Sequence, residues 1–317
     1  MKAPFPWPGG KSRAAHLIWS ALGDVANYVE PFAGSLAVLL ARPTAPRIET
    51  VNDADCYLAN FYRAVQHAPE DVARFVDWPV NEADLHARHL WLVSRTDFRE
   101  RMKTDPEFFD AKIAGWWAWG LCAWIGTGWC DLTRAAPATQ IPHLGTAGMG
   151  VHRQIPHLGD AGRGVHRKLP HLGDAGRGQF AGLSERLRRV RVACGDWSRV
   201  MGDSVTWRHG VTGVLLDPPY DDGEAMYSAG GQGIAADVRA WCAEHGDNPR
   251  LRIALCGYEG DPEPVGWTKV PWKAQGGYGS QRKSGTNDNA RRERIWFSPH
   301  CLGAGEQLEL GIAGGAL

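Results

Sequence analysis

Residues 27–40, NYVEPFAGSLAVLL, constrain the fold of this chain more than any other segment. A short β-like stretch comes first, a Pro-Phe-Ala-Gly-Ser turn follows, and an apolar helix-like run completes the segment. A strand, a glycine turn and a helix in this order open many α/β nucleotide-binding sheets. The first strand-like stretch ends on the acidic residue Glu30, and the next one, in ETVNDAD, also ends on an acidic residue. That residue, Asp53, lies 19 residues beyond Gly34. A carboxylate there can accept from both ribose hydroxyls, which predicts a cofactor that contains adenosine.

The segment LLDPPYDD at residues 215–222 ends another apolar run on a rigid loop. Proline lacks the N–H that a strand ladder needs and keeps the preceding residue extended, so we expect a strand to stop here. The loop supplies a carboxylate at Asp217, a backbone carbonyl at Pro218 and an aromatic face at Tyr220. Two acceptors beside a flat ring suit a planar exocyclic amine, because they bind its two hydrogens while the ring stacks. The loop is therefore predicted to make an aromatic amine nucleophilic.

The chain between these motifs has a different pattern. Residues 56 to about 130 are helical in periodicity and rich in Trp, Ala, Arg and Glu. Three near-copies of a PHLG-containing segment then start at Ile141, Ile155 and Leu169, with a period of 14 residues. Their density of Pro and Gly predicts loops or short hairpins in place of a long helix.

The repeat region is also basic. Between residues 149 and 191 there are nine Lys or Arg against three acidic residues. Two interpretations stay open: a solvated insertion, or a basic arm that lies along phosphates. A second basic cluster, with Arg291 and Arg292, lies in a segment that we expect to close over a substrate. The candidate nucleic-acid contacts are Arg153, Arg163, Arg167, Lys168, Arg177, Arg282 and Lys283.

The strand-like pattern returns after the repeats, in RVRVACGDW, GVLLDPPY and RIALCGYEG. The simplest organisation is one discontinuous α/β domain of residues 1–55 and 181–317, interrupted by an insert of residues 56–180 that includes the repeats at 141–180. We expect a Rossmann-like sheet with a mainly helical insert that carries a Gly/Pro-rich basic segment.

Composition excludes several classes of protein. No apolar run is long enough to span a membrane and no apolar signal segment is present, so we expect a cytoplasmic protein. The 35 basic and 35 acidic residues cancel, so binding to nucleic acid must depend on local patches. The seven cysteines form no C-x-x-C pair, which predicts reduced thiols and no metal site. The chain also lacks a Pro-Cys pair, the usual source of the thiolate in cytosine C5 methylation.

Simpler interpretations exist for the individual motifs. The GGKS at residues 9–12 looks like the end of a phosphate-binding loop, but the glycine that such a loop needs is replaced by Phe5. Trp7 could cap the core and Lys11 could be a solvated charge. Asp53 could cap the helix that follows it, although a capping acid and a ribose acid belong at the same end of a strand.

Four motifs taken together resemble one family. WPGGK at 7–11, YVEPFAGS at 28–35, VNDAD at 51–55 and DPPY at 217–220 occur in the order found in the Dam-like (D12 or alpha class) adenine-specific DNA methyltransferases. The resemblance runs from Trp7 to the strand near Trp296. It implies a Rossmann-like fold that uses S-adenosyl-L-methionine to methylate N6 of an adenine flipped out of double-stranded DNA. It also implies target recognition by the insert, although the triplicated PHLG segment matches no recognition hairpin of the family.

The resemblance implies a role for each matching position. The implied cofactor contacts are Trp7, Lys11, Glu30, Pro31, Phe32, Gly34, Asp53 and Asp217, with Asp196 and Trp197 beside the cofactor adenine. The implied catalytic loop is Asp217, Pro218, Pro219 and Tyr220. Other functions stay open at this point: transfer to cytosine N4, modification of RNA or of a protein amide, and a DNA-binding module of the same fold without turnover. The sequence leaves the recognition site, the oligomeric state and any restriction nuclease partner undetermined.

Overall fold

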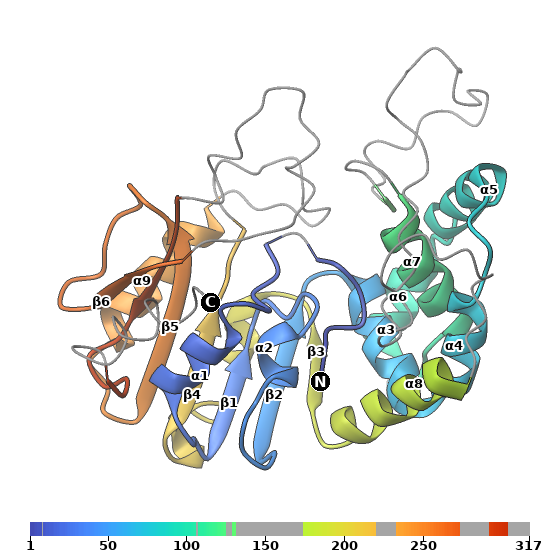
Figure 1. Cartoon of the computed structure of the whole chain (residues 1–317). Helices are drawn as coiled ribbons and strands as arrows, with labels where there is room; N and C mark the ends of the chain where they lie inside the picture. Colours follow the sequence, from blue (N-terminus) through green and yellow to red (C-terminus); the bar gives the residue numbers. More distant parts are fainter. Residues whose placement is uncertain are drawn as a thin grey trace, which may run out of the picture. The chain divides into compact units, whose positions relative to one another are not determined.

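The computed structural model describes residues 1–7, 9–105, 107–124, 129–130, 174–219, 233–272 and 292–303. The chain forms two compact units (Figure 1). The first unit consists of Met1–Lys2, Pro8–Ala54 and Arg189–Leu317, and the second of Ala3–Trp7 and Asp55–Arg188. The first unit is therefore assembled from segments on both sides of the second in sequence.

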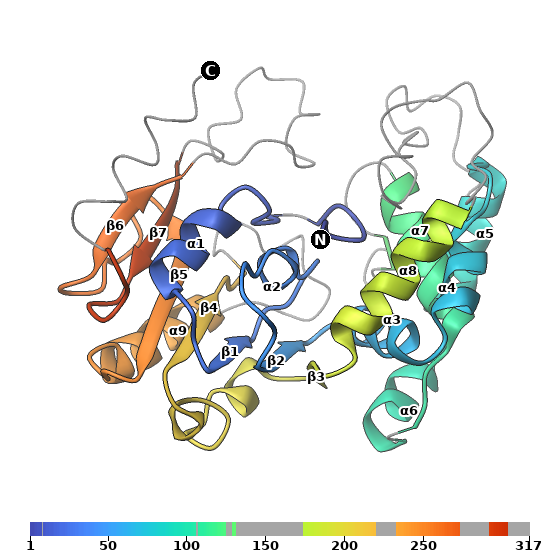
Figure 2. The same ribbon diagram turned by 60° about the horizontal axis from the view of Figure 1, so that its bottom comes forward.

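The described part of the first unit contains a seven-stranded sheet (Figures 1 and 2). Its strands are β1 (Asn27–Glu30), β2 (Ile48–Asp53), β3 (Arg191–Cys194), β4 (Thr212–Leu216), β5 (Leu251–Tyr258), β6 (Thr268–Pro271) and β7 (Glu293–Phe297). Their order is β3-β2-β1-β4-β5-β7-β6. The first five in this order are parallel, whereas β7 runs antiparallel to both β5 and β6. The mixed α/β class predicted from the sequence is confirmed.

Helices cover both faces of the sheet. Strand β4 is buried along its whole length, as is usual for a parallel strand with a layer on each side. Helix α9 (Ile234–His245) contributes Val238 to a core that also contains Val29 and Val214. Helix α1 (Ala15–Leu22) lies on the opposite face, where Trp19 packs on Tyr28. The described part of this unit is completed by three short elements, α2 (Ala37–Leu40), η3 (Trp197–Val200) and η4 (Trp207–His209).

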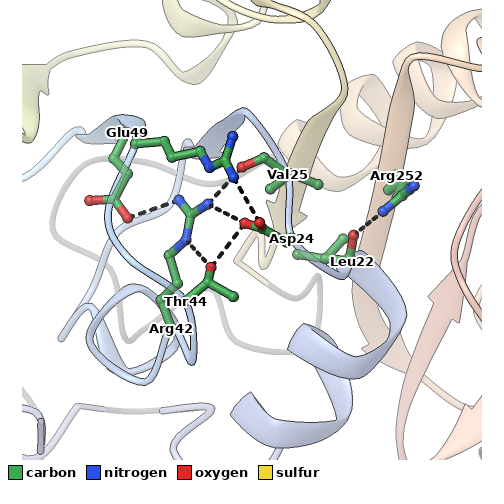
Figure 3. A network of polar contacts seen from close by, with 8 residues as sticks. Leu22, Asp24, Val25, Arg42, Thr44, Glu49 and Arg252 are labelled. Atoms are coloured by element: carbon green, nitrogen blue, oxygen red, sulfur yellow. Dashed lines mark hydrogen bonds and ion pairs between the residues drawn. The ribbon is translucent and has the colours of Figure 1, made fainter.

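A buried arginine ties together the loops that lead into β1 and β2 (Figure 3). Arg42 lies between α2 and β2, and its Nη1 is 3.2 Å from Glu49 Oε1. Its Nη2 donates to the carbonyl of Val25 at 2.6 Å, and its Nε donates to Thr44 Oγ1 at 3.2 Å. Asp24 Oδ1 lies 3.6 Å from Nη2. The guanidinium thus neutralises a buried carboxylate and fixes the amino edge of the sheet.

Substitution Arg42→Met should destabilise the first unit strongly. The side chains of Arg42 and Glu49 are each 1% exposed, so the change removes the guanidinium that neutralises a buried carboxylate. We expect the free energy of unfolding, measured by urea denaturation, to fall by about 3–5 kcal/mol. Arg47→Met is the matched control, because Arg47 pairs with Asp24 at the surface and is 54% exposed. That variant should lose less than about 1 kcal/mol, and equal losses in the two variants would contradict the assignment.

The described part of the second unit is helical. Its helices are α3 (Cys56–His67), α4 (Pro69–Val76), α5 (Glu82–Val93), α6 (Phe98–Thr104), α7 (Ala111–Ala123) and α8 (Asp174–Leu187). Asp55, Asn81 and Asp110 each accept backbone N–H groups at the start of the helix that follows. The helical pattern predicted from residue 56 onward is confirmed as far as Ala123. None of the helices in the described ranges is long and apolar enough to cross a membrane.

Helix α8 corrects one expectation. The sequence predicted loops or hairpins through the third repeat, yet a helix begins at Asp174 within it. Phe180, Leu183 and Leu187 are buried at helical spacing, and α8 packs on α3 and α4, so burial of this apolar face outweighs the low helix propensity of the glycines. The boundary predicted between residues 180 and 181 falls inside this helix. Residues 141–173, which hold most of the repeats, lie outside the described part of the chain.

Candidate active site

The candidate site lies in the first unit, at the carboxyl edge of its parallel strands. Strands β1, β2, β3 and β4 are neighbours and end at this edge. Ligands of open α/β sheets bind outside the carboxyl ends of the strands. Most of the candidate positions that the structure describes follow these four strand ends directly.

The turn after β1 is held by Asp53. The backbone N–H of Gly34 donates to Asp53 Oδ2 at 3.1 Å, and Ala33 N donates to the carbonyl of Asn52 at 2.9 Å. The chain needs two left-handed residues to enter α2, Gly34 with φ 46° and Leu36 with φ 57°. Glycine adopts this conformation at little cost, whereas leucine does so only where its surroundings hold it. Asp53 therefore shapes the glycine turn in addition to its predicted role toward a ribose.

Asn52, near the end of β2, bonds to the turns after β1 and β3 and was not among the residues predicted from the sequence. Its Nδ2 donates to the carbonyls of Pro31 and Gly195, at 3.0 Å in both cases. The side chain is buried, and among the described residues its Oδ1 accepts no hydrogen bond. Its signal in the sequence was weak, because Asn52 is one of several polar residues in β2. The asparagine fixes the turns after β1 and β3 relative to each other.

Glu30 ends β1 as a buried acid. The hydroxyl of Tyr28 donates to its Oε2 at 3.1 Å. Burial raises the pKa of Glu30 to about 8, against the hydrogen bond from Tyr28, which lowers it. A group with this pKa is mostly protonated at neutral pH. Its predicted contact with a cofactor stays a prediction.

The turn after β3 presents an aromatic pair. Asp196 caps the short helix η3 by accepting from the backbone N–H of Ser198 at 2.9 Å, and Trp197 packs into the core. The ring of Phe32, from the turn after β1, stacks on Trp197 with 6.0 Å between centroids and 27° between planes. The structure therefore brings Phe32 and Trp197 together, and their contact with a cofactor stays a prediction.

Asp217 follows β4 and forms an ion pair with Lys11. Lys11 Nζ lies 2.8 Å from Asp217 Oδ1 and donates to the carbonyl of Gly9 at 2.7 Å. The lysine side chain is 3% exposed and the aspartate side chain 21%, so the carboxylate is the more accessible of the two. Pro218 is buried and Pro219 half-buried, while Tyr220 lies outside the described residues. A rigid, partly accessible carboxylate at a strand end is suited to accept hydrogen bonds from a substrate.

The charge on Lys11 is maintained despite burial. Burial alone would lower the pKa of Lys11, but its attraction to Asp217 raises it well above the ordinary value. The ring of Trp272 adds a cation–π contact, 5.4 Å from Nζ to the ring centroid. The sequence predicted a cofactor contact for this lysine, whereas in the structure it forms an ion pair with the predicted catalytic acid. The contact of Lys11 with a cofactor stays a prediction.

Glu293 is a second carboxylate near Lys11 and was also missed. It begins β7, and its Oε2 lies 3.8 Å from Lys11 Nζ. Burial raises the pKa of the Glu293 carboxyl to about 7, Lys11 opposes the rise and Asp217 adds to it. Its signal in the sequence was weak, because a glutamate at the start of an apolar strand is usually solvated.

The remaining predicted residues lie elsewhere. Trp7 belongs to the second unit, where its ring packs near Phe5 and Trp117 at centroid distances of 6.0 and 6.2 Å. Arg177 lies in α8, but its side chain is outside the described part. The other predicted DNA contacts also fall outside it: Arg153, Arg163, Arg167, Lys168, Arg282 and Lys283. Within the described ranges, no group of three or more His, Cys, Asp or Glu side chains could hold a metal ion.

One comparison with known proteins gives a match. Residues 7–111 match the family of D12 class N6 adenine-specific DNA methyltransferases. The matched segment contains the turn after β1, Asp53 and Lys11, and it ends before the loop at Asp217. None of the curated proteins that were compared with the chain matches it.

Proposed function

We propose, starting from the match to the D12 class family, that this chain is a DNA methyltransferase that transfers a methyl group from S-adenosyl-L-methionine to N6 of adenine. The match supports N6 methylation of adenine in DNA, and the mixed seven-stranded sheet is consistent with a methyltransferase fold. The observation that carries the proposal is the Asp217 carboxylate, fixed by Lys11 at the same sheet edge as the glycine turn and Asp53.

The residues at this edge fit an adenosine cofactor. Asp53 and the exposed Asp196 supply carboxylates, Phe32 and Trp197 supply aromatic surface, and Gly34 lets a ligand approach the backbone. We assign the ribose hydroxyls to Asp53 and the amino acid part of the cofactor to the turn from Glu30 to Gly34. When bound, S-adenosyl-L-methionine supplies an electrophilic methyl group.

The loop after β4 prepares the amine. Asp217 accepts one N–H of the adenine amine, and the carbonyl of Pro218 accepts the other. These bonds orient the amine and increase the electron density on its nitrogen, because both hydrogens are drawn toward acceptors. Tyr220 is assigned to stack on the base, which must leave the duplex to reach Asp217. Lys11 keeps the carboxylate in position.

The second unit is the proposed target-recognition region. Its helices interrupt the first unit in sequence, and the basic repeat segment lies between α7 and α8. Cations in this segment and in the second basic cluster would neutralise phosphates and offset the cost of flipping the base, a few kcal/mol. The proposed contacts are Arg153, Arg163, Arg167, Lys168, Arg177, Arg282 and Lys283.

Nucleoside analysis of methylated DNA tests the proposal. The purified protein should convert adenine to N6-methyladenine in double-stranded DNA when S-adenosyl-L-methionine is present. Because Asp217 and Pro218 would serve cytosine N4 equally well, recovery of N4-methylcytosine would redirect the proposal to that base. Binding of DNA without any modified base, under conditions where the cofactor also binds, would indicate a non-catalytic module.

Substitution Asp53→Asn should weaken cofactor binding. Asparagine can still accept from the N–H of Gly34 and so preserve the turn, but it removes the negative charge that faces the ribose. Calorimetric titration with S-adenosyl-L-methionine should show a loss of affinity of about tenfold. Asp247→Asn, at a fully solvated aspartate before β5, is the control and should bind like wild type. Unchanged affinity in Asp53→Asn would remove Asp53 from the cofactor site.

A further inference from the structure

A row of acidic groups, buried except for the partly accessible Asp217, lies on one face of the sheet. Leu216 of β4 pairs with Leu255 of β5, so the residues that follow them, Asp217 and Cys256, are neighbours. On the other side of β5, Tyr258 pairs with Glu293 of β7. Paired residues share a face and alternate residues along a strand return to it, which places Asp217, Cys256 and Glu293 on the same face. Val29 of β1 pairs with Val214 of β4, and both side chains point to the opposite face. Glu30, the next residue of β1, therefore lies on the same face as Asp217.

Lys11 interacts with two carboxylates of this row, those of Asp217 and Glu293. Its Nζ is 2.8 Å from Asp217 Oδ1 and 3.8 Å from Glu293 Oε2, and the side chains of Lys11 and Glu293 are 3% and 8% exposed. Among the described residues, Glu293 Oε2 accepts no hydrogen bond, and the ammonium group of Lys11 lies 3.8 Å from it. A single positive charge that is buried between two carboxylates interacts with both. How strongly it interacts with each one depends on whether both are ionised.

We propose that Glu293 is a positioning residue that shares the Lys11 ammonium with Asp217 and thereby sets how strongly Asp217 accepts the hydrogen bond of the substrate amine. The inference rests on the proposed function, since it assigns the amine to Asp217. An ionised Glu293 draws part of the ammonium charge toward itself, and Asp217 then keeps more electron density for the substrate. A neutral Glu293 leaves the charge with Asp217 and weakens it as an acceptor.

The pKa of Glu293 lies near neutral pH. Burial raises its pKa to about 7, and the titratable groups that face it or its neighbours are Lys11, Asp217, Cys256 and Glu30. Burial also raises the pKa of Cys256, which is thus a neutral thiol, and the raised pKa of Lys11 keeps the lysine charged. Glu293 is therefore expected to change charge near neutral pH, and Glu30, with a pKa of about 8, at slightly higher pH.

A comparison of Glu293→Gln with wild type across pH tests the inference. Glutamine has the shape of a protonated glutamate, so the two proteins should methylate DNA at the same single-turnover rate at about pH 6. At about pH 8 wild type should be about tenfold faster, because only its Glu293 is then ionised. The matched control is Glu259→Gln, an exposed glutamate near the end of β5 that pairs with Arg294, and its rate should follow wild type throughout.

Two further measurements separate the possible outcomes. The ¹⁵N chemical shift of Lys11 Nζ should titrate near pH 7 in wild type and lose this step in Glu293→Gln, which reports charge sharing without any methylation assay. Equal melting temperatures of wild type and variant at about pH 6 would show that the fold is intact. A constant ratio of rates across pH in a methylating enzyme overturns the inference alone. A wild-type protein that binds DNA and cofactor but methylates nothing overturns the proposed function.

Discussion

Substitution Asp217→Asn is expected to lower kcat for methylation by about a thousandfold. In the proposed mechanism the carboxylate accepts an N–H of the amine, and asparagine lacks its charge. The buried ammonium of Lys11 would also bind the amide oxygen, because it lies 2.8 Å from Oδ1 in wild type. The amide NH₂ would then face the substrate amine, so that a donor meets a donor. Single-turnover assays with saturating cofactor measure the effect on the chemical step.

Cofactor affinity and a second aspartate provide the controls for Asp217→Asn. Calorimetry should show S-adenosyl-L-methionine binding within about tenfold of wild type, because the glycine turn and Asp53 are unchanged. Asp203→Asn alters a solvated aspartate that pairs with Arg208, and this variant should methylate at the wild-type rate. A rate in Asp217→Asn that is close to wild type would exclude this residue from the reaction.

Substitution Lys11→Met should cause the second large effect, on stability. It removes a buried ammonium from between the buried carboxylate of Glu293 and the partly accessible carboxylate of Asp217, and we expect the free energy of unfolding to fall by about 3–5 kcal/mol. The loss should be greater at about pH 9 than at about pH 5. Urea denaturation of both proteins at the two pH values measures the difference, and a loss that is independent of pH would contradict the charge argument.

The sign of this dependence follows from Glu293. Its folded-state pKa of about 7 exceeds the value of an unfolded glutamate, so the folded protein retains a proton that the unfolded chain has lost. Stability therefore decreases as pH rises from the unfolded to the folded pKa. Because Lys11 lowers the pKa of Glu293, the loss of the Lys11 ammonium raises this pKa, and stability then continues to decrease up to a higher pH. Adding Glu293→Gln to Lys11→Met should restore part of the stability at about pH 9, and no recovery would show that the two side chains are not coupled.

The sequence predicted best those features that depend on local chain order. The strand, glycine turn and helix at residues 27–40 are found as β1, the turn at Gly34 and α2. Asp53 and Asp217 were placed at strand ends from apolar runs and prolines, and both lie there. These features are set by periodicity and turn chemistry within a few residues, which a single sequence displays directly.

Features that depend on distant segments were missed or placed wrongly. Asn52 bridges the turns at Pro31 and Gly195, and the second of these is 143 residues away. Helix α8 forms in a glycine-rich repeat because α3 and α4 bury its apolar face. Neither partner is visible in the local sequence, so propensity alone predicted loops at the start of α8.

Sequence alone indicated the kind of chemistry, because a glycine turn, an acidic residue at a strand end and an Asp-Pro-Pro-Tyr loop carry their donors and acceptors in their residue types. Only the tertiary structure decided which charged groups surround Asp217. The sheet register brings Glu293 and Asp217 to one face, and the amino-terminal segment places Lys11 between them. Charge state depends on burial and on the distance between ionisable groups, and both are properties of the folded chain.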